Sequence, residues 1–302
     1  ADRSSGVFQR LRLQLRRVAA VRRFCRTEKP DAVFAFLTKV SLLTLAANLG
    51  TGVPVVACER NNPERQATHP LWNAILRRLY GRAALIVCQT RGSMRCIPSR
   101  LHDRVVVIPN PIMPYGVDSQ RSGATLVAVG RLTHQKGFDL LISAFAAIAD
   151  RHPDWGIDIW GEGPEREALE KQIHQVELDD RIRLRGQSER PGSWLETASA
   201  FILPSRYEGF PNVLGEAMAA GLPAIAARCD FGPEEIIEDG QTGLLAESEN
   251  VDALSGAIDR LLADDELRAA LGTNAELAIR RFAPETVAMQ WDEALSRAVH
   301  RP

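Results

Sequence analysis

Residues 200–216 read Ala-Phe-Ile-Leu-Pro-Ser-Arg-Tyr-Glu-Gly-Phe-Pro-Asn-Val-Leu-Gly-Glu, and this stretch decides the fold. Its first four residues are apolar, which predicts a short buried strand over Ala200–Leu203. A polar loop follows, and Pro211 then suits the first position of a helix that ends at Gly221. A strand that leads through a short loop into a helix is the unit from which parallel α/β sheets are built.

The same alternation runs along most of the chain. Short apolar runs predict strands at 31–36, 54–58, 84–88, 104–108, 124–129, 156–160, 181–185, 200–203, 223–227 and 243–246. Helical patterns predict helices at 40–49, 71–80, 91–99, 137–149, 164–176 and 212–220, and from about Asn250 the pattern is helical only. Alternation at this spacing predicts an α/β fold of doubly wound parallel sheets, covered by helices on both faces.

The proline-rich stretch from Pro109 to Gly116 is the predicted boundary between two domains. Proline removes a backbone donor and disfavours helix in the residue before it, so this stretch should be extended. We expect a first domain at 1–110, a linker at 111–123, a second domain at 124–282, and a helix at 283–302 that packs back on the first domain. The first domain has four predicted strands against six, and there is no initiator methionine, so we expect it to lack its first βα elements.

Composition limits the class of protein. A hydrophobic share of 45% and a charged share of 25% are typical of a globular protein. No apolar run approaches the roughly 20 residues that a membrane-spanning helix needs. The five cysteines are scattered and contain no C-x-x-C pair, which argues against a disulfide framework or a zinc site and indicates a reducing compartment.

Positive charge is concentrated in the first third of the chain. Residues 1–100 hold 18 lysines and arginines against five aspartates and glutamates, although the whole chain has a net charge of −1. Within this part, residues 7–29 mix apolar side chains with arginines in a helical pattern. Such a helix can lie on anionic lipid headgroups. It can equally cover the first domain with solvated arginines, and the sequence leaves both possibilities open.

Candidate binding residues follow two of the predicted strands of the second domain. Arg131 and Lys136 flank glycines just after strand 124–129, where they could neutralise a phosphate. Glu208 precedes the helix that starts near Pro211, and Glu216 lies within its next turns. A helix start presents unpaired N–H groups and attracts anions, whereas carboxylates accept hydrogen bonds from hydroxyl groups. The alternative is that the cations and Glu216 are ordinary solvated side chains.

These motifs together resemble a known family. Gly130-Arg131 with Lys136-Gly137, the segment Gly161-Glu162-Gly163-Pro164, and Glu208 with Glu216 are similar to the donor domain of retaining glycosyltransferases of family 4. The similarity runs from about residue 31 to residue 282. It implies the GT-B fold, in which two Rossmann-like domains have a cleft between them.

The resemblance also implies a role for each motif residue. Arg131 and Lys136 would bind the diphosphate and stabilise the leaving group, and Glu208 would hold the hydroxyls of the transferred hexose. Glu216 would bind the ribose, and Gly161 and Gly163 would keep the floor of the site open. The other implied donor-binding residues are Gly130, Arg185, Gly209, Phe210, Asn212, Val213 and Leu214.

The first domain departs from the family at one position. Cys58-Glu59-Arg60-Asn61-Asn62-Pro63 has a glutamate where many relatives have a histidine. It looks like the S-E-R-N-x-P variant of exopolysaccharide and lipid-linked-glycan transferases. Glu59 and Arg60 are therefore acceptor-side candidates, although a salt bridge between loops is an equally good interpretation.

The resemblance implies transfer of a hexose or N-acetylhexosamine from a nucleotide-diphosphate sugar, such as a UDP-sugar, with retention of configuration. The acceptor would be a lipid-linked glycan or a polysaccharide. No cofactor and no metal are expected, since the sequence has no Asp-x-Asp motif, and no nucleic-acid partner is expected. We expect a cytoplasmic enzyme, peripheral on the inner face of the cytoplasmic membrane. The alternative is a nucleotide-sugar-binding protein without turnover.

Overall fold

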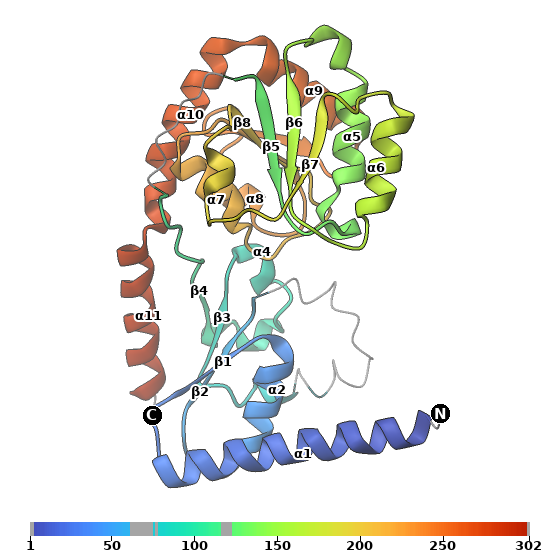
Figure 1. Ribbon diagram of the computed structural model, residues 1–302. Helices are drawn as coiled ribbons and strands as arrows, with labels where there is room; N and C mark the ends of the chain where they lie inside the picture. Colours follow the sequence, from blue (N-terminus) through green and yellow to red (C-terminus); the bar gives the residue numbers. More distant parts are fainter. Residues whose placement is uncertain (1–2, 61–74, 76–77, 116–122, 301–302) are drawn as a thin grey trace. The chain divides into compact units, whose positions relative to one another are not determined.

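A computed structural model describes residues 3–60, 75, 78–115 and 123–300 of the chain. Most of the predicted helix at 71–80 and part of the predicted linker at 111–123 lie outside these residues. The chain divides into two compact units. Unit 1 comprises Ala1–Pro109 and Val287–Pro302, and unit 2 comprises Asn110–Thr286. Each is built on its own parallel sheet (Figure 1).

The sheet of unit 2 has six parallel strands, in the order β10-β9-β8-β5-β6-β7. They are β5 (Thr125–Val129), β6 (Gly156–Trp160), β7 (Ile182–Gly186), β8 (Ala200–Leu203), β9 (Ala224–Arg228) and β10 (Leu244–Glu247). The chain fills one side of β5 first and then crosses to β8 on the other side. This is the strand order of dinucleotide-binding folds, whose ligands bind where the order reverses.

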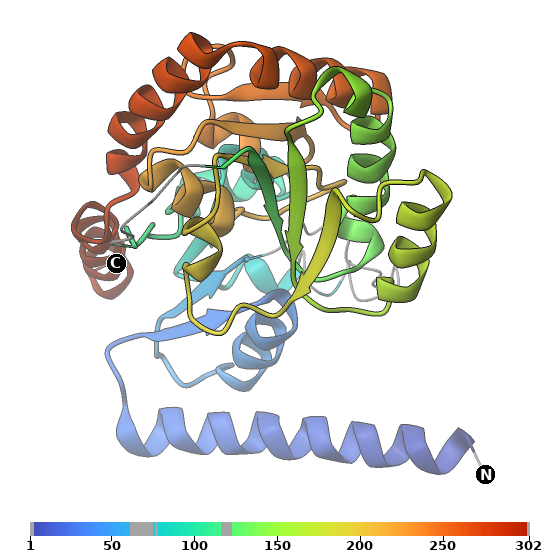
Figure 2. The same ribbon diagram turned by 45° about the horizontal axis from the view of Figure 1, so that its top comes forward.

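Helices cover both faces of this sheet (Figure 2). Against one face pack α5 (Phe138–Ala146), α6 (Arg166–Gln175) and α9 (Val251–Ala263). Against the other pack α7 (Asn212–Ala219) and α8 (Pro233–Ile236). The helix α10 (Asp265–Ile279) contributes buried side chains to both faces.

Strand residues alternate strictly between the two cores. In β5, Leu126 and Ala128 belong to the core under α5, whereas Val127 belongs to the core under α7. In β8, Ile202 faces the first core and Phe201 the second. This period of two comes from the pleat, and burial on both faces explains why the strands read as continuous apolar runs.

The sheet of unit 1 has four parallel strands in their chain order. They are β1 (Val33–Phe36), β2 (Val55–Cys58), β3 (Leu85–Cys88) and β4 (Val105–Val107). On one face lie α2 (Thr38–Ala47) and α4 (Arg91–Met94), which contribute Leu45 and Met94 to the core. The opposite face is covered by α11 (Pro284–Val299) from the other end of the chain, through Val287, Ala294 and Ala298.

The helix α1 (Arg3–Glu28) lies beside α2 in unit 1 (Figure 1). Cys25 is buried, and the guanidinium of Arg22 donates to the carbonyl oxygens of Ala47 and Leu49 at the end of α2, at 3.2 and 2.7 Å. The basic side chains Arg12, Arg16 and Arg23 are exposed. Among the described residues, no helix has the length and apolar character to cross a membrane.

The ten predicted strands and the doubly wound parallel architecture are confirmed, with strand ends shifted by at most two residues. The helix predicted at 91–99 is wrong beyond Met94, where α4 ends and a 3₁₀ segment follows at Ser99–Arg104. Pro98 explains this, because it disfavours helix in the residue before it. Pro211 is the residue before α7 rather than its first residue, since its ψ of 88° is not helical.

Candidate active site

Two loops of unit 2 meet where the strand order of the sheet reverses. One follows β5 and includes the 3₁₀ turn η2 (His134–Lys136), and the other follows β8 and leads into α7. They approach so closely that a Cβ built on Gly137 would lie 2.1 Å from the carbonyl oxygen of Pro204. Gly137 also has a φ of 66°. Only glycine satisfies both conditions, so this residue fixes the distance between the two loops.

Lys136 and Glu208 form an ion pair across this junction. Lys136 Nζ lies 2.6 Å from Glu208 Oε1, and the two side chains are 16% and 8% exposed. Ser205, which is fully buried, donates its hydroxyl to the same oxygen at 2.7 Å. Within the described part of the chain, Glu208 Oε2 accepts no hydrogen bond. The pair therefore keeps one carboxylate oxygen and further ammonium donors available for a ligand.

The start of α7 lies directly beyond Glu208. The amides of Gly209, Phe210, Asn212 and Val213 donate no hydrogen bond to any residue that the structure describes. Unpaired amides at a helix start attract anions. The Phe210 ring is buried against Phe282 at 5.5 Å between centroids, so only its backbone is available to a ligand. Leu214 is likewise buried.

Glu216 lies on α7, about one turn after the helix begins at Asn212, and is partly buried. Burial raises the pKa of its carboxyl. Burial and, next, the charge of Glu216 raise the pKa of the Tyr115 hydroxyl, so this tyrosine lies near the carboxylate. Tyr115 lies in the proline-rich stretch that the sequence predicts to be an extended connector, and no motif identifies it there.

The glycines after β5 and β6 allow the loops that follow these two strands to pack closely on each other. A Cβ on Gly161 would lie 1.8 Å from the carbonyl oxygen of Gly130, and one on Gly163 would lie 2.2 Å from that of Leu132. Each of these glycines thus lets its loop pack directly on the backbone of the loop after β5. A Cβ on Gly130 would meet the stem of Lys136 at 3.1 Å, so Gly130 makes room for that lysine. Arg131 is exposed beside it.

Arg185 lies at the end of β7, away from the Lys136–Glu208 pair along the same edge of the sheet. Its guanidinium lies 5.4 Å from the ring centre of Trp160, a cation–π distance. Its Nε lies 3.6 Å from the buried carboxylate of Asp158. Arg185 and Trp160 thus form a flat, partly exposed wall at the carboxyl ends of β6 and β7.

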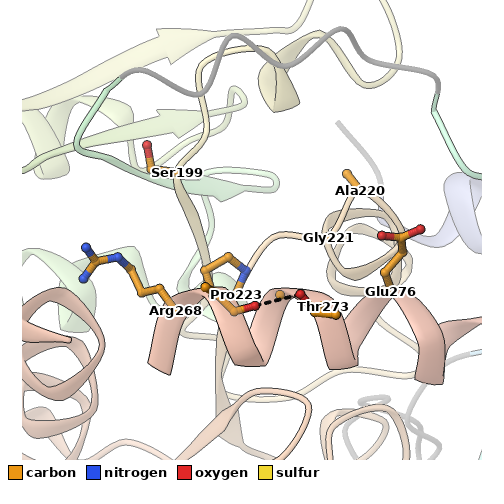
Figure 3. A pocket seen from close by; sticks show the side chains of 9 residues that line it. Ser199, Ala220, Gly221, Pro223, Arg268, Thr273 and Glu276 are labelled. Atoms are coloured by element: carbon orange, nitrogen blue, oxygen red, sulfur yellow. Dashed lines mark hydrogen bonds between the residues drawn. The ribbon is translucent and has the colours of Figure 1, made fainter. Parts of the chain in front are cut away.

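A hollow of about 480 Å³ lies elsewhere in unit 2 (Figure 3). Ser199 and Pro223, which line it, precede β8 and β9, so it lies at the amino ends of the strands, opposite the loops described above. Figure 3 shows Arg268 and Thr273 of α10 at its border. Arg268 donates to the carbonyl oxygens of Leu261 and Leu262 at the end of α9, and Thr273 donates to that of Ala269 in α10.

The acceptor-side candidates of the sequence analysis lie in unit 1, directly after β2. Glu59 is 2% exposed, and Thr38 at the start of α2 donates to its Oε2 at 2.6 Å. Its other oxygen is buried and has no hydrogen-bond partner among the residues that the structure describes. Burial raises the pKa of Glu59 to about 7, despite the opposing hydrogen bond from Thr38. This carboxyl is therefore partly protonated near neutral pH.

Arg60 packs over two aromatic rings of the same unit. Its guanidinium lies 5.0 Å from the ring centre of Phe36 and 5.4 Å from that of Trp291. Trp291 belongs to α11, so the far end of the chain helps to orient a residue that follows β2. Burial lowers the pKa of Arg60. No sequence motif identifies Thr38 or Trp291, which only the fold brings to this place.

Two family models match the sequence. Residues 118–278 match the model described as glycosyl transferases group 1. Residues 3–111 match the model described as glycosyl transferase 4-like domain. Together they cover nearly the whole chain.

Named relatives and solved structures agree with these matches. An exopolysaccharide phosphotransferase of Streptomyces coelicolor is 34% identical over 93% of this chain. The amylovoran biosynthesis glycosyltransferase AmsD of Erwinia amylovora is 26% identical over 91% of this chain and 80% of its own length. HepE of Anabaena, solved with UDP and glucose, is 21% identical and has a TM-score of 0.82, with 92% of this chain and 81% of that one covered. The chain spans only 30% of the length of the Streptomyces protein.

At such identity a structural likeness shows the fold alone. The two parallel-sheet α/β units and these neighbours establish the GT-B fold for the chain.

The buried carboxyl of Glu59 gives a test that needs no ligand. Between about pH 4.5 and pH 7 the folded chain holds a proton that the unfolded chain releases, so this group makes the free energy of unfolding fall as pH rises. Glu59→Gln cannot titrate. The free energy of unfolding of this variant, measured in urea, should therefore rise by about 2–3 kcal/mol relative to that of the wild type as the pH is raised from 5 to 8.

The control for this measurement is Glu293→Gln, which changes an exposed glutamate of the same unit. The pH dependence of Glu59→Gln is read relative to this control. A Glu59→Gln difference with the same pH dependence as the control would contradict a raised pKa at Glu59.

Proposed function

Because the chain belongs to the glycosyl transferases group 1 family, we propose that it transfers a hexose or N-acetylhexosamine from a nucleotide-diphosphate sugar to a glycan acceptor. The observation that carries the proposal is the Lys136–Glu208 pair, held at 2.6 Å beside the start of α7. The site lies where the strand order reverses. Its cation and the amides at the start of α7 suit the phosphates of such a donor, and its carboxylate suits the sugar hydroxyls.

In this proposal the diphosphate binds at the start of α7. Lys136 has three N–H donors and gives one to Glu208, so it can also donate to a phosphate oxygen. Arg131 lies on the same loop and is exposed, which allows its side chain to reach the same group. As the bond to the sugar breaks, negative charge grows on the departing phosphate. Fixed cations and amides stabilise that charge without reorganisation and could replace a metal ion.

Glu208 would orient the sugar. Its Oε1 is occupied by Lys136 and Ser205, so hexose hydroxyls would donate to Oε2. Glu216 would accept from the ribose hydroxyls, beside Tyr115, and Arg185 with Trp160 would border the base. We propose retention of configuration, with the departing phosphate oxygen taking the proton of the acceptor hydroxyl. A dedicated protein base is then not needed.

The acceptor would bind to unit 1. Glu59 and Arg60 follow the carboxyl end of β2, and Arg60 is oriented by Phe36 and Trp291. One named relative is an exopolysaccharide phosphotransferase, and another is an amylovoran biosynthesis glycosyltransferase. We therefore propose a lipid-linked or polysaccharide acceptor, used by an enzyme that is peripheral on the cytoplasmic side of the membrane.

The helix α1 would provide the membrane contact. Its partly buried side chains Gln14, Val18 and Val21 recur with Cys25 at helical spacing and face the rest of unit 1. Arg12, Arg16 and Arg23 lie on the opposite face, and the exposed Leu13 and Phe24 flank them. A row of arginines bordered by apolar side chains suits an anionic lipid surface.

Consumption of a nucleotide sugar in the presence of lipid-linked acceptors tests the activity. A panel of uridine and guanosine diphosphate sugars is first screened by thermal shift, because the matching donor should stabilise unit 2 most. We expect transfer from that donor. Binding of the donor without any consumption would instead favour a binding protein.

Two carboxylate variants test the assignment of roles in this site. Glu216→Ala should weaken binding of the free nucleoside diphosphate by about 10-fold or more, because a charged hydrogen-bond acceptor is lost. Glu208→Ala should leave that affinity within about threefold and should remove the gain in affinity that the sugar provides. Calorimetry with UDP and with the UDP-sugar measures both. Equal losses for both variants with UDP alone would refute the separate roles.

Reversal of the α1 arginines tests the membrane contact. The triple variant of Arg12, Arg16 and Arg23 to glutamate should bind vesicles with anionic lipids about 100-fold more weakly, since each basic residue contributes about 1 kcal/mol. The control carries the same charge change at the exposed Lys171, Arg260 and Arg297. Unchanged sedimentation of the first variant with the vesicles would rule the contact out.

A further inference from the structure

Arg206 is a nearly buried guanidinium two residues before Glu208. Its side chain is 9% exposed. Nη1 and Nη2 donate to the two carboxylate oxygens of Asp139 at 2.7 and 2.6 Å. This is the bidentate geometry that a guanidinium forms and an ammonium cannot. Asp139 lies in the first turn of α5, directly after the loop that carries Lys136.

The same residue joins the two loops of the candidate site. Nη1 of Arg206 donates to the carbonyl oxygen of His134, and its backbone N–H donates to that of Gln135, both at 2.8 Å. The Gln135 side chain donates in return to the carbonyl oxygen of Tyr207 at 3.0 Å. Each of these bonds ends within two residues of Lys136 or Glu208. Displacement of either loop would therefore break several of them together.

The charges around Arg206 stabilise its ion pair with Asp139. Burial by itself would raise the pKa of Asp139, but the hydrogen bonds and charge of Arg206 lower it overall. The hydrogen bond to Asp139, followed by its charge, raises the pKa of Arg206. Glu249 Oε2 adds an ion contact at 3.7 Å from Nε. Both partners thus stay ionised through the physiological range of pH.

We propose that Arg206, through Asp139, is a positioning residue that holds Lys136 and Glu208 at contact distance and so sets the rate of sugar transfer. The inference rests on the function proposed above. Arg206 itself does not touch the reacting atoms. It acts on the geometry of two groups that do, and misplacement by about 1 Å costs a reaction of this kind about 100-fold.

The first test compares Arg206→Lys with Arg151→Lys. Arg151 forms an exposed ion pair with Asp259 at 2.8 Å in the same unit and serves as the matched control. Arg206→Lys should lower kcat for donor consumption about 10- to 100-fold. Its affinity for UDP should fall by less than kcat does, because Lys136 is only one of the proposed contacts to the nucleotide, and the amides of α7 and Glu216 are unchanged. Arg151→Lys should match the wild type in both.

A double-mutant cycle separates positioning from general stabilisation. In a Lys136→Met background the pair is already broken, so Arg206→Lys should then lower the residual kcat by less than about threefold. A loss as large as in the wild-type background would overturn the proposal. If Arg206→Lys does not fold, which its melting transition reveals, Asp139→Asn replaces it and should act in the same direction.

Amide hydrogen exchange provides a measurement that is independent of turnover. In Arg206→Lys the amides of Lys136 and Glu208, which are bonded to Thr133 and Asp230, should exchange at least about tenfold faster. Those of β7 should not change. Unaltered exchange at both loop amides would overturn the positioning role. A wild type that binds UDP but consumes no donor would instead refute the proposed function alone.

Discussion

The close approach of two loops at the strand-order reversal of unit 2 is the constraint on which the candidate site depends. Gly137 and Pro204 leave no room for a side chain between the loops. This contact brings Lys136, from the loop after β5, to Glu208, from the loop after β8, although they are 72 positions apart in the sequence. The order of the strands makes this contact possible. The strands β5 and β8 are neighbours in the sheet, and the connection after β5 leads to one side of the sheet whereas the connection after β8 leads to the other side.

Charge burial then sets the chemistry of this place. An isolated buried carboxylate is costly, and breaking a buried ion pair by removal of one partner costs about 3–5 kcal/mol. Glu208 avoids this through Lys136 and Ser205, and Arg206 avoids it through Asp139. Two adjacent ion pairs thus have different surroundings. The Lys136–Glu208 pair lies beside the amides at the start of α7 and has a carboxylate oxygen left for a ligand. In the Arg206–Asp139 pair, Arg206 also donates to carbonyl oxygens of the neighbouring loop.

In unit 1, the charged residues after β2 have different surroundings. In the described part of unit 1, no ion pair joins Glu59 to a cation, and burial raises its pKa to about 7. The neighbouring Arg60 is held by aromatic rings, one of them from α11. The last helix of the chain is therefore part of the acceptor-side architecture as well as the cover of one sheet face. Its apolar residues Val287, Ala294 and Ala298 complete a core that the first hundred residues leave open on that side.

The sequence by itself determined the strands and the parallel architecture, and it predicted the division near Pro109 and the residues of the donor motif. These follow from local signals: apolar runs of four or five residues, proline and glycine at defined positions, and charged residues directly after strands. Only the tertiary structure decided which of these residues touch. Lys136 and Glu208 were expected to hold different parts of a ligand, yet they also bind each other. Arg206, Ser205, Thr38 and Trp291 carried no motif, because their roles come from contacts between segments that are distant in sequence. Periodicity reports which face of an element is buried, but it does not report which element lies opposite.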